Sequence, residues 1–164
     1  MQIFKRYLGK NLYQSLERNI TMNDTAKNLL TLIGRLTFVA LFLPAGLAKV
    51  SGFEGTVGYI ASVGLPLPTL AALVALVIEI VGSLALLAGF ATPLASIVLA
   101  VFTLVATFAF HAFWAVPADQ AFVTQLLFYK NIAVVGCLLT LAAQGAGSFS
   151  LDARREQESN LVHA

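Results

Sequence analysis

The chain has 164 residues, of which 59% are hydrophobic and only 11% are charged, with ten basic and eight acidic side chains. A soluble domain carries about 25% charged residues, and a soluble domain of this size could not bury so much apolar surface. The composition therefore excludes disordered, collagen-like and ordinary soluble proteins and indicates an integral membrane protein. The net charge of +2 gives no reason to expect nucleic-acid binding, and the single cysteine excludes an internal disulfide.

The first 27 residues form a basic segment. Apolar residues recur every four positions from Phe4 to Ile20, with lysines and arginines among them. This pattern is typical of an amphipathic helix on an anionic membrane surface, and a poorly ordered terminus is the alternative. A cleaved signal peptide is disfavoured, because the apolar run that follows is too long and is interrupted by Arg35.

Four stretches have the length of about 20 mostly apolar residues that crosses the hydrocarbon core of a membrane. They cover residues 28–49, 67–88, 92–114 and 122–142. The second and third stretches are joined by three residues, so they must be antiparallel neighbours. The predicted fold is an all-α transmembrane four-helix bundle formed by residues 28–144, followed by a tail of residues 145–164.

Basic residues indicate the orientation of the bundle. They cluster before the first span and in the tail, at Arg154 and Arg155, whereas the loops 50–66 and 115–121 carry none. Short loops and termini rich in lysine and arginine stay in the cytoplasm. We therefore expect a multi-pass protein of the plasma membrane with both termini cytoplasmic.

Polar residues inside the spans are the candidate ligand site. They are Arg35, Glu79, His111, Lys130 and Asn131, with Lys49 at the end of the first span. A charge at membrane depth costs several kcal/mol unless it is paired or hydrated. Counting helix rise from the outer face predicts a buried Arg35–Glu79–Lys130 cluster, with His111 and Lys49 above it at the mouth. A cavity with this net positive charge suits an anionic or polarised carbonyl group.

Each of these residues also has a purely structural interpretation. Arg35 and Glu79 can form an ion pair that only sets the helix register, and Lys49 can be an anchor at the membrane surface. His111 can be an interfacial residue, and Asn131 can bridge two helices. A histidine without a second histidine or a cysteine nearby is a poor metal ligand, so we predict no metal site.

The remaining patterns carry little chemistry. The aromatic residues at the end of the third span favour an interfacial aromatic belt over a cofactor site: Phe108, Phe110, Phe113 and Trp114. Cys137 is interpreted as a packing residue. The chain contains none of the GxGxxG, P-loop, GxSxG or HExxH motifs, so no catalytic residue is assigned.

Several motifs follow one another along the chain: RLTFVALFLPAGLAKVSGF from Arg35, VGLPLP at 63–68, VIEIVGSLALLAGFATP around Glu79, His111 in the aromatic end of the third span, and FYKNIAVVGCLLTLAAQGAGSFSLD at 128–152. In this order they resemble the DoxX family of small four-helix membrane proteins. The resemblance covers about residues 29–152 and is closest to bacterial inner-membrane members. The basic N-terminal extension and the Thr92-Pro93 pair, where an arginine is often found, depart from the family pattern.

The family is named for a membrane subunit associated with thiosulfate:quinone oxidoreductase. The resemblance therefore implies a quinone as the candidate cofactor and a redox or thiol-metabolism protein as the candidate partner. Our first hypothesis is a quinone- or redox-linked membrane subunit, in which Lys130, His111 and Glu79 contact the head group. In this hypothesis Arg35 keeps Glu79 ionised. Any enzymatic role is at most that of a subunit in a membrane oxidoreductase complex.

Two other functions compete with this hypothesis. A structural or assembly subunit would dock a soluble partner through the basic N-terminal segment. A small transporter ranks lower, because four unbroken helices without an inverted repeat lack the usual transporter features. The lipid bilayer is the expected environment, and a homo-oligomer remains open.

Overall fold

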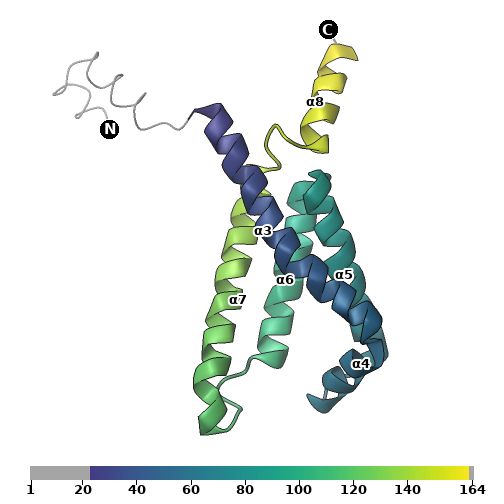
Figure 1. Cartoon of the computed structure of the whole chain (residues 1–164), viewed down its shortest axis with the longest axis vertical. Coiled ribbons are helices and arrows are strands. Elements are labelled where there is room, and N and C mark those ends of the chain that lie inside the picture. The colour runs from purple at the N-terminus through teal and green to yellow at the C-terminus, as the bar shows by residue number, and fades with distance from the viewer. Residues whose placement is uncertain (1–22, 163–164) are drawn as a thin grey trace, which may run out of the picture.

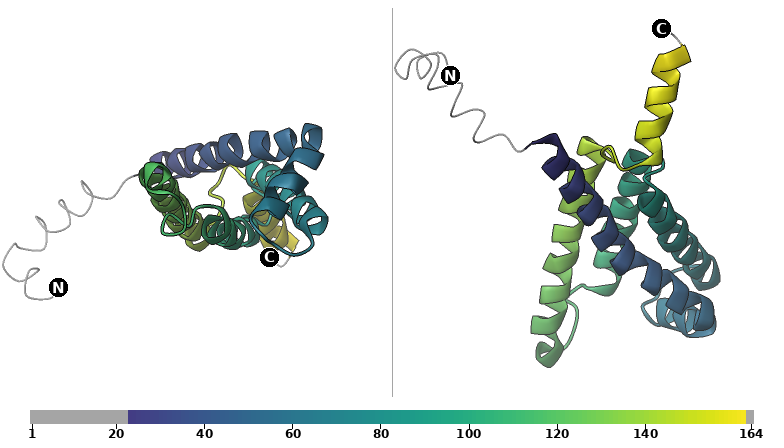
Figure 2. Two further views of the ribbon diagram at one scale, coloured as in Figure 1. Left: turned by 90° about the horizontal axis from the view of Figure 1, so that it is seen from below. Right: turned by 45° about the horizontal axis from the view of Figure 1, so that its top comes forward.

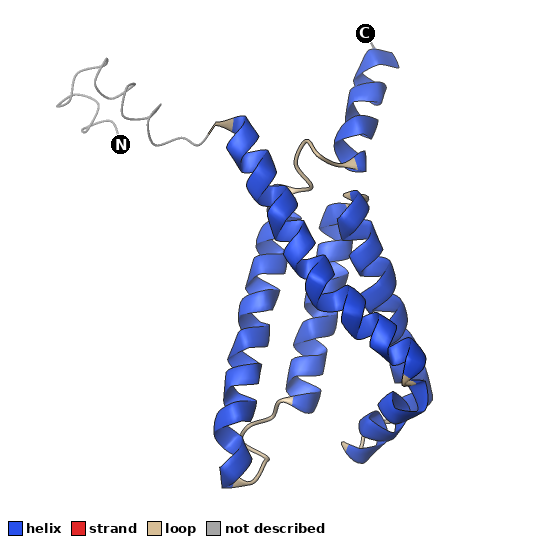
Figure 3. Ribbon diagram, viewed as in Figure 1, coloured by secondary structure: helices blue, strands red, loops and turns tan. Residues whose placement is uncertain are grey.

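The computed structural model describes residues 23–162, which are all-helical with connecting loops (Figures 1 and 3). Within these residues, four helices are long and apolar enough to cross a membrane. They are α3 (Asp24–Ser51), α5 (Pro68–Ala88), α6 (Thr92–Phe110) and α7 (Ala118–Gln144). The predicted all-α fold with four membrane spans is confirmed. The amphipathic pattern of the first 22 residues lies outside the described residues.

Two short helices lie in segments where no helix is predicted. α4 (Phe53–Ser62) occupies the glycine-rich loop after the first span, where Ile60 is buried. α8 (Leu151–Val162) lies in the tail, and Ser150 Oγ accepts a hydrogen bond from Ala153 N at its start. Glycine lowers the helix propensity of α4 in isolation, so burial of Ile60 supplies a stabilisation that propensity alone does not.

The connection between α5 and α6 has the expected turn chemistry. Gly89 ends α5 with a φ of +64°, and its N–H bonds to carbonyls of the last turn of α5. Glycine adopts this left-handed conformation without the steric cost that other residues incur. Pro68 and Pro93 lie in the first turns of α5 and α6, where a missing N–H breaks no helical hydrogen bond.

The four long helices surround a central axis (Figure 2). α3 crosses the bundle diagonally and packs mainly on α5, whereas α7 packs on α6 (Figure 1). α3 begins and α8 leaves the bundle at one end, which we name the tail end. α4 lies at the other end, which we name the α4 end (Figure 1).

The packed core is concentrated toward the tail end. Its buried members include Phe42 of α3, Leu86 of α5, Leu99 of α6 and Leu138 of α7. Toward the α4 end, α5 and α6 diverge (Figures 1 and 2). The bundle is therefore tightly packed near the tail end, and its cavity lies near the α4 end, where the candidate site lies.

Candidate functional site

A cavity of about 820 Å³ lies within the α4 end of the bundle. Helices α3 to α7 all contribute residues to its wall. Most of these residues are apolar, and the aromatic ones are Phe42, Tyr59, Phe102 and Phe110. Its volume is within the range of small-molecule sites, which combine apolar walls with a few polar groups.

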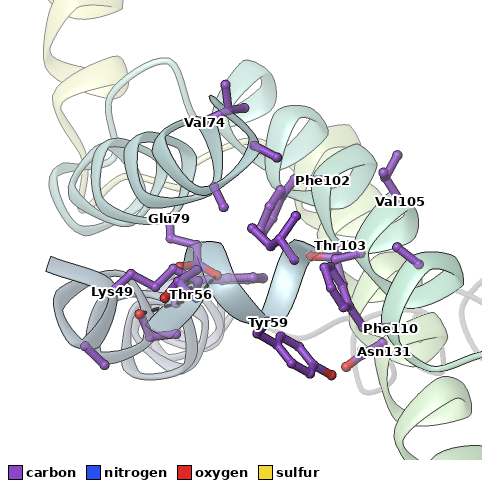
Figure 4. A pocket seen from close by; sticks show the side chains of 18 of the residues that line it. Lys49, Thr56, Tyr59, Val74, Glu79, Phe102, Thr103, Val105, Phe110 and Asn131 are labelled. Carbon is purple, nitrogen blue, oxygen red and sulfur yellow. Dashed lines mark hydrogen bonds and ion pairs between the residues drawn. The ribbon is translucent and has the colours of Figure 1, made fainter. Parts of the chain in front are cut away.

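The main polar feature of the cavity is an ion pair between Lys49 and Glu79. Lys49 Nζ donates to both carboxylate oxygens, at 2.7 Å to Oε2 and 3.0 Å to Oε1 (Figure 4). The Glu79 side chain is 7% exposed and the Lys49 side chain 24% exposed. Charge-assisted hydrogen bonds of this length are strong, and removing either partner leaves an uncompensated charge.

A glycine on α3 allows this pair to form. A Cβ added at Gly46 would lie 2.8 Å from Ile80 Cγ1 and 3.1 Å from Glu79 Cβ. α3 and α5 therefore approach each other closely at Gly46, one turn before Lys49. The close approach brings the lysine within hydrogen-bonding distance of Glu79.

His111 and Asn131 also line the cavity, on the side formed by α6 and α7. His111 directly follows the last residue of α6, and burial together with the nearby charge of Lys130 lowers its pKa below the usual 6.5. Lys130 itself is exposed and does not line the cavity. A neutral imidazole is thus favoured at pH 7, and it can donate one hydrogen bond and accept another.

Two aromatic side chains pack together in the wall of the cavity. Tyr59 of α4 stacks on Phe110 of α6, with ring centroids 5.2 Å apart and ring planes 21° apart. The stack joins α4 to the end of α6 across the cavity (Figure 4). The sequence pattern assigned Phe110 to an aromatic belt and left Tyr59 unassigned, because no motif marked residues 50–66 as a helix.

The predicted Arg35–Glu79–Lys130 cluster is not formed. Arg35 is 1% exposed and donates from Nη2 to the carbonyl of Phe149, at 2.5 Å. Its Nη1 lies against Gly89, at the tail-end terminus of α5. Gly89 is ten residues from Glu79, or roughly 15 Å along the helix. The sequence estimate was wrong because α3 is tilted and shifted, which puts Lys49 rather than Arg35 beside Glu79.

The tail loop is held by a separate set of hydrogen bonds around Asp152. Its carboxylate accepts from Ala91 N at 2.8 Å and from Thr92 N at 3.0 Å, at the start of α6. Asp152 N donates in turn to the Gly89 carbonyl, at 2.9 Å. A carboxylate at a helix N-terminus satisfies free N–H groups and complements the helix dipole. Together with the Arg35 contact, these bonds fasten the tail to the bundle.

The six candidate residues therefore divide into two groups. Lys49, Glu79, His111 and Asn131 surround one cavity, whereas Arg35 and Lys130 lie outside its wall. Their part in ligand binding stays a prediction. Within residues 23–162 no three His, Cys, Asp or Glu side chains come together as metal ligands.

Comparisons with known proteins place the chain in a family. The DoxX family model matches residues 30–112, which run from α3 to the end of α6 and include Lys49, Glu79 and His111. Over 129 residues the chain is 36% identical to the inner membrane protein YphA of Escherichia coli (strain K12), covering 79% of this chain and 92% of the relative. No solved structure matches the chain. The chain is thus an integral, multi-pass inner-membrane protein of the DoxX family.

Proposed function

We propose that the protein is a quinone- or redox-linked membrane subunit, and that its cavity binds the quinone head group. The observation that supports this proposal is the Lys49–Glu79 pair within an apolar, aromatic-lined cavity. A quinone combines an aromatic-sized apolar ring with carbonyl oxygens that accept hydrogen bonds. Apolar walls suit the ring, and a protonated amine suits a carbonyl.

Lys49 has a proton to offer such a carbonyl. Two of its three N–H groups donate to Glu79, and the third donates to the Ala45 carbonyl, at 3.4 Å. A bond of that length is weak, so exchanging it for a quinone carbonyl costs little. Glu79 would keep the ammonium in place, and the neutral imidazole of His111 would offer a second polar contact. This set replaces the sequence-based set, in which Lys130 contacted the head group.

The proposed orientation places the cavity in the outer half of the membrane. Lys27, Arg154 and Arg155 lie at the tail end, and this excess of basic residues favours a cytoplasmic location for that end. We infer that residues 1–27 and 145–164 are cytoplasmic segments flanking a membrane domain of residues 28–144. The α4 end then faces the outside.

The amount of quinone that co-purifies with the protein tests the proposal. The wild-type protein, the K49M/E79M double variant and the K130M variant would be purified in mild detergent and extracted with organic solvent. The extracts would be separated and quantified by quinone absorbance. The double variant removes both charges together and leaves no unpaired one. K130M removes an exposed charge of the same type outside the cavity wall.

We expect near-stoichiometric quinone in the wild type and in K130M, and at least tenfold less in K49M/E79M. No quinone in the wild-type extract, or equal amounts in all three, would overturn the proposal. Equal thermal unfolding of the three proteins would show that the loss does not come from misfolding.

A further inference from the structure

We infer that the cavity opens sideways into the bilayer between α5 and α6, and that its ligand is an amphiphile with a polar head and one long apolar chain. The inference rests on the proposed function and extends it. The head would lie at Lys49, and the chain would leave between Val74 of α5 and Val105 of α6.

The two valines belong to the cavity wall and to the outer surface at once. Both line the cavity. Val74 is nevertheless 46% exposed and Val105 is 63% exposed. Both lie inside spans, roughly 9 Å and 8 Å from the helix ends at the α4 end. At that depth an exposed side chain contacts lipid chains. Each of the two valines therefore borders both the cavity and the hydrocarbon region of the membrane.

The proposed opening lies beyond the level at which α5 and α6 pack closely. Near the core the helices are tightly joined, since a Cβ added at Gly82 would lie 2.9 Å from Leu99 Cγ. About two turns further on, Val74 and Val105 lie at similar heights on antiparallel helices. Between these levels α5 and α6 diverge (Figures 1 and 2).

The opening lies across the cavity from the ion pair. In Figure 4, Val74 and Val105 lie on the side of the cavity away from Lys49, and the aromatic residue Phe102 lies between Lys49 and Val105. A molecule that reaches from Lys49 to this opening must be polar at one end and apolar at the other. A water-soluble ligand has no apolar part that an opening to the lipid would stabilise. An apolar chain that passes through the opening stays in contact with lipid and out of water.

Two quinones that share one head group, of which only one carries an apolar chain, measure what the chain adds to binding. One is 2,3-dimethoxy-5-methylbenzoquinone, which has no chain, and the other is its decyl derivative. Equilibrium binding of both to detergent-purified protein would be measured for the wild type, for V74W/V105W and for V81W/V101W. Val81 and Val101 are 59% and 56% exposed on the same two helices but do not line the cavity.

We expect the wild type to bind the decyl quinone at least tenfold more tightly than the head alone. V74W/V105W should lose that advantage while its affinity for the head stays unchanged, and V81W/V101W should behave as the wild type. If the double variant folds poorly, the single V105W variant, at the more exposed of the two positions, should show the same effect to a smaller extent.

The outcomes distinguish the two proposals. A wild type that binds neither quinone would overturn the proposed function itself. A wild type that binds both equally, or a V74W/V105W variant that retains the preference for the decyl quinone, would overturn the side opening alone. An equal loss of both quinones in V74W/V105W would also contradict it, because the chain would then not pass between these valines.

Discussion

Glu79 and Lys49 depend on each other for stability as well as for the proposed binding. Each charge is acceptable in a largely apolar cavity only because the other neutralises it. Glu79→Gln should therefore destabilise the protein, at or below the lower end of the about 3–5 kcal/mol typical of a broken buried pair, because Lys49 keeps partial exposure. Thermal unfolding in detergent measures the effect.

The double variant K49M/E79M is the matched control for this prediction. It should unfold close to the wild-type temperature, because two apolar side chains replace the two charges. A double variant less stable than Glu79→Gln would contradict the interpretation that the unpaired lysine causes the loss.

The pKa of His111 should depend on the charge of Lys130. Burial and that charge both lower the His111 pKa, so Lys130→Met should raise it toward the usual 6.5 while burial keeps it below. Titration of isotope-labelled histidine by NMR, with His163 replaced by alanine to leave one signal, measures the shift. Lys27→Met, which removes a charge at the tail end, should leave the pKa unchanged. An unchanged His111 pKa in Lys130→Met would refute the assigned cause.

At the level of the helices, Gly46 sets the distance between α3 and α5. Gly46→Ala puts a methyl group 2.8 Å from Ile80 Cγ1, so the helices must separate. Overpacking of this kind costs about 1–3 kcal/mol. Gly34→Ala, on the same helix, adds a methyl group with nothing within 4 Å and should be neutral or stabilising. Thermal unfolding compares the two, and equal stability would contradict the close approach.

The spans could be predicted from the sequence, but the register between them could not. Apolar length and Pro68 located the helices to within a few residues, because these are properties of one segment. The partner of Glu79 depends on how α3 slides and tilts against α5. That arrangement is set by close approach at Gly46 and by the contact of Arg35 with the tail loop, which are properties of paired surfaces.

The missed helices have a related cause. α4, whose Tyr59 stacks on Phe110 of α6, lies in a segment whose glycines are typical of a loop, and burial of Ile60 against the bundle overrides that preference. Of the six site residues named from the sequence, four line the cavity. The grouping of these four could not be predicted in advance.

At the level of the whole molecule, the proposed orientation has the α4 end facing the outside. Single cysteines placed in a C137S background test this orientation with a membrane-impermeant maleimide on intact inner-membrane spheroplasts. A cysteine at Ser62, the exposed last residue of α4, should react, whereas one at Glu158 of α8 should react only after the membrane is opened. The reverse pattern would contradict the proposed orientation.

The bundle has a packed core toward the tail end and a cavity toward the α4 end, and this division suits the proposed ligand binding. Packing of Phe42, Leu86, Leu99 and Leu138, with the tail fastened by Asp152, stabilises one half without filling the other. The cavity can therefore accept a ligand without disrupting the core that holds the helices together.

Photolabelling with an azidoquinone is the most direct test of quinone binding in the cavity. After illumination of the protein in its native membrane, labelled peptides would be mapped by mass spectrometry in the wild type and in K49M/E79M. We predict that the label attaches within residues 41–60 and 102–111, and that the double variant loses it. Label spread over the lipid-facing surface around Val81 and Val101, or equal labelling of both proteins, would contradict quinone binding in the cavity.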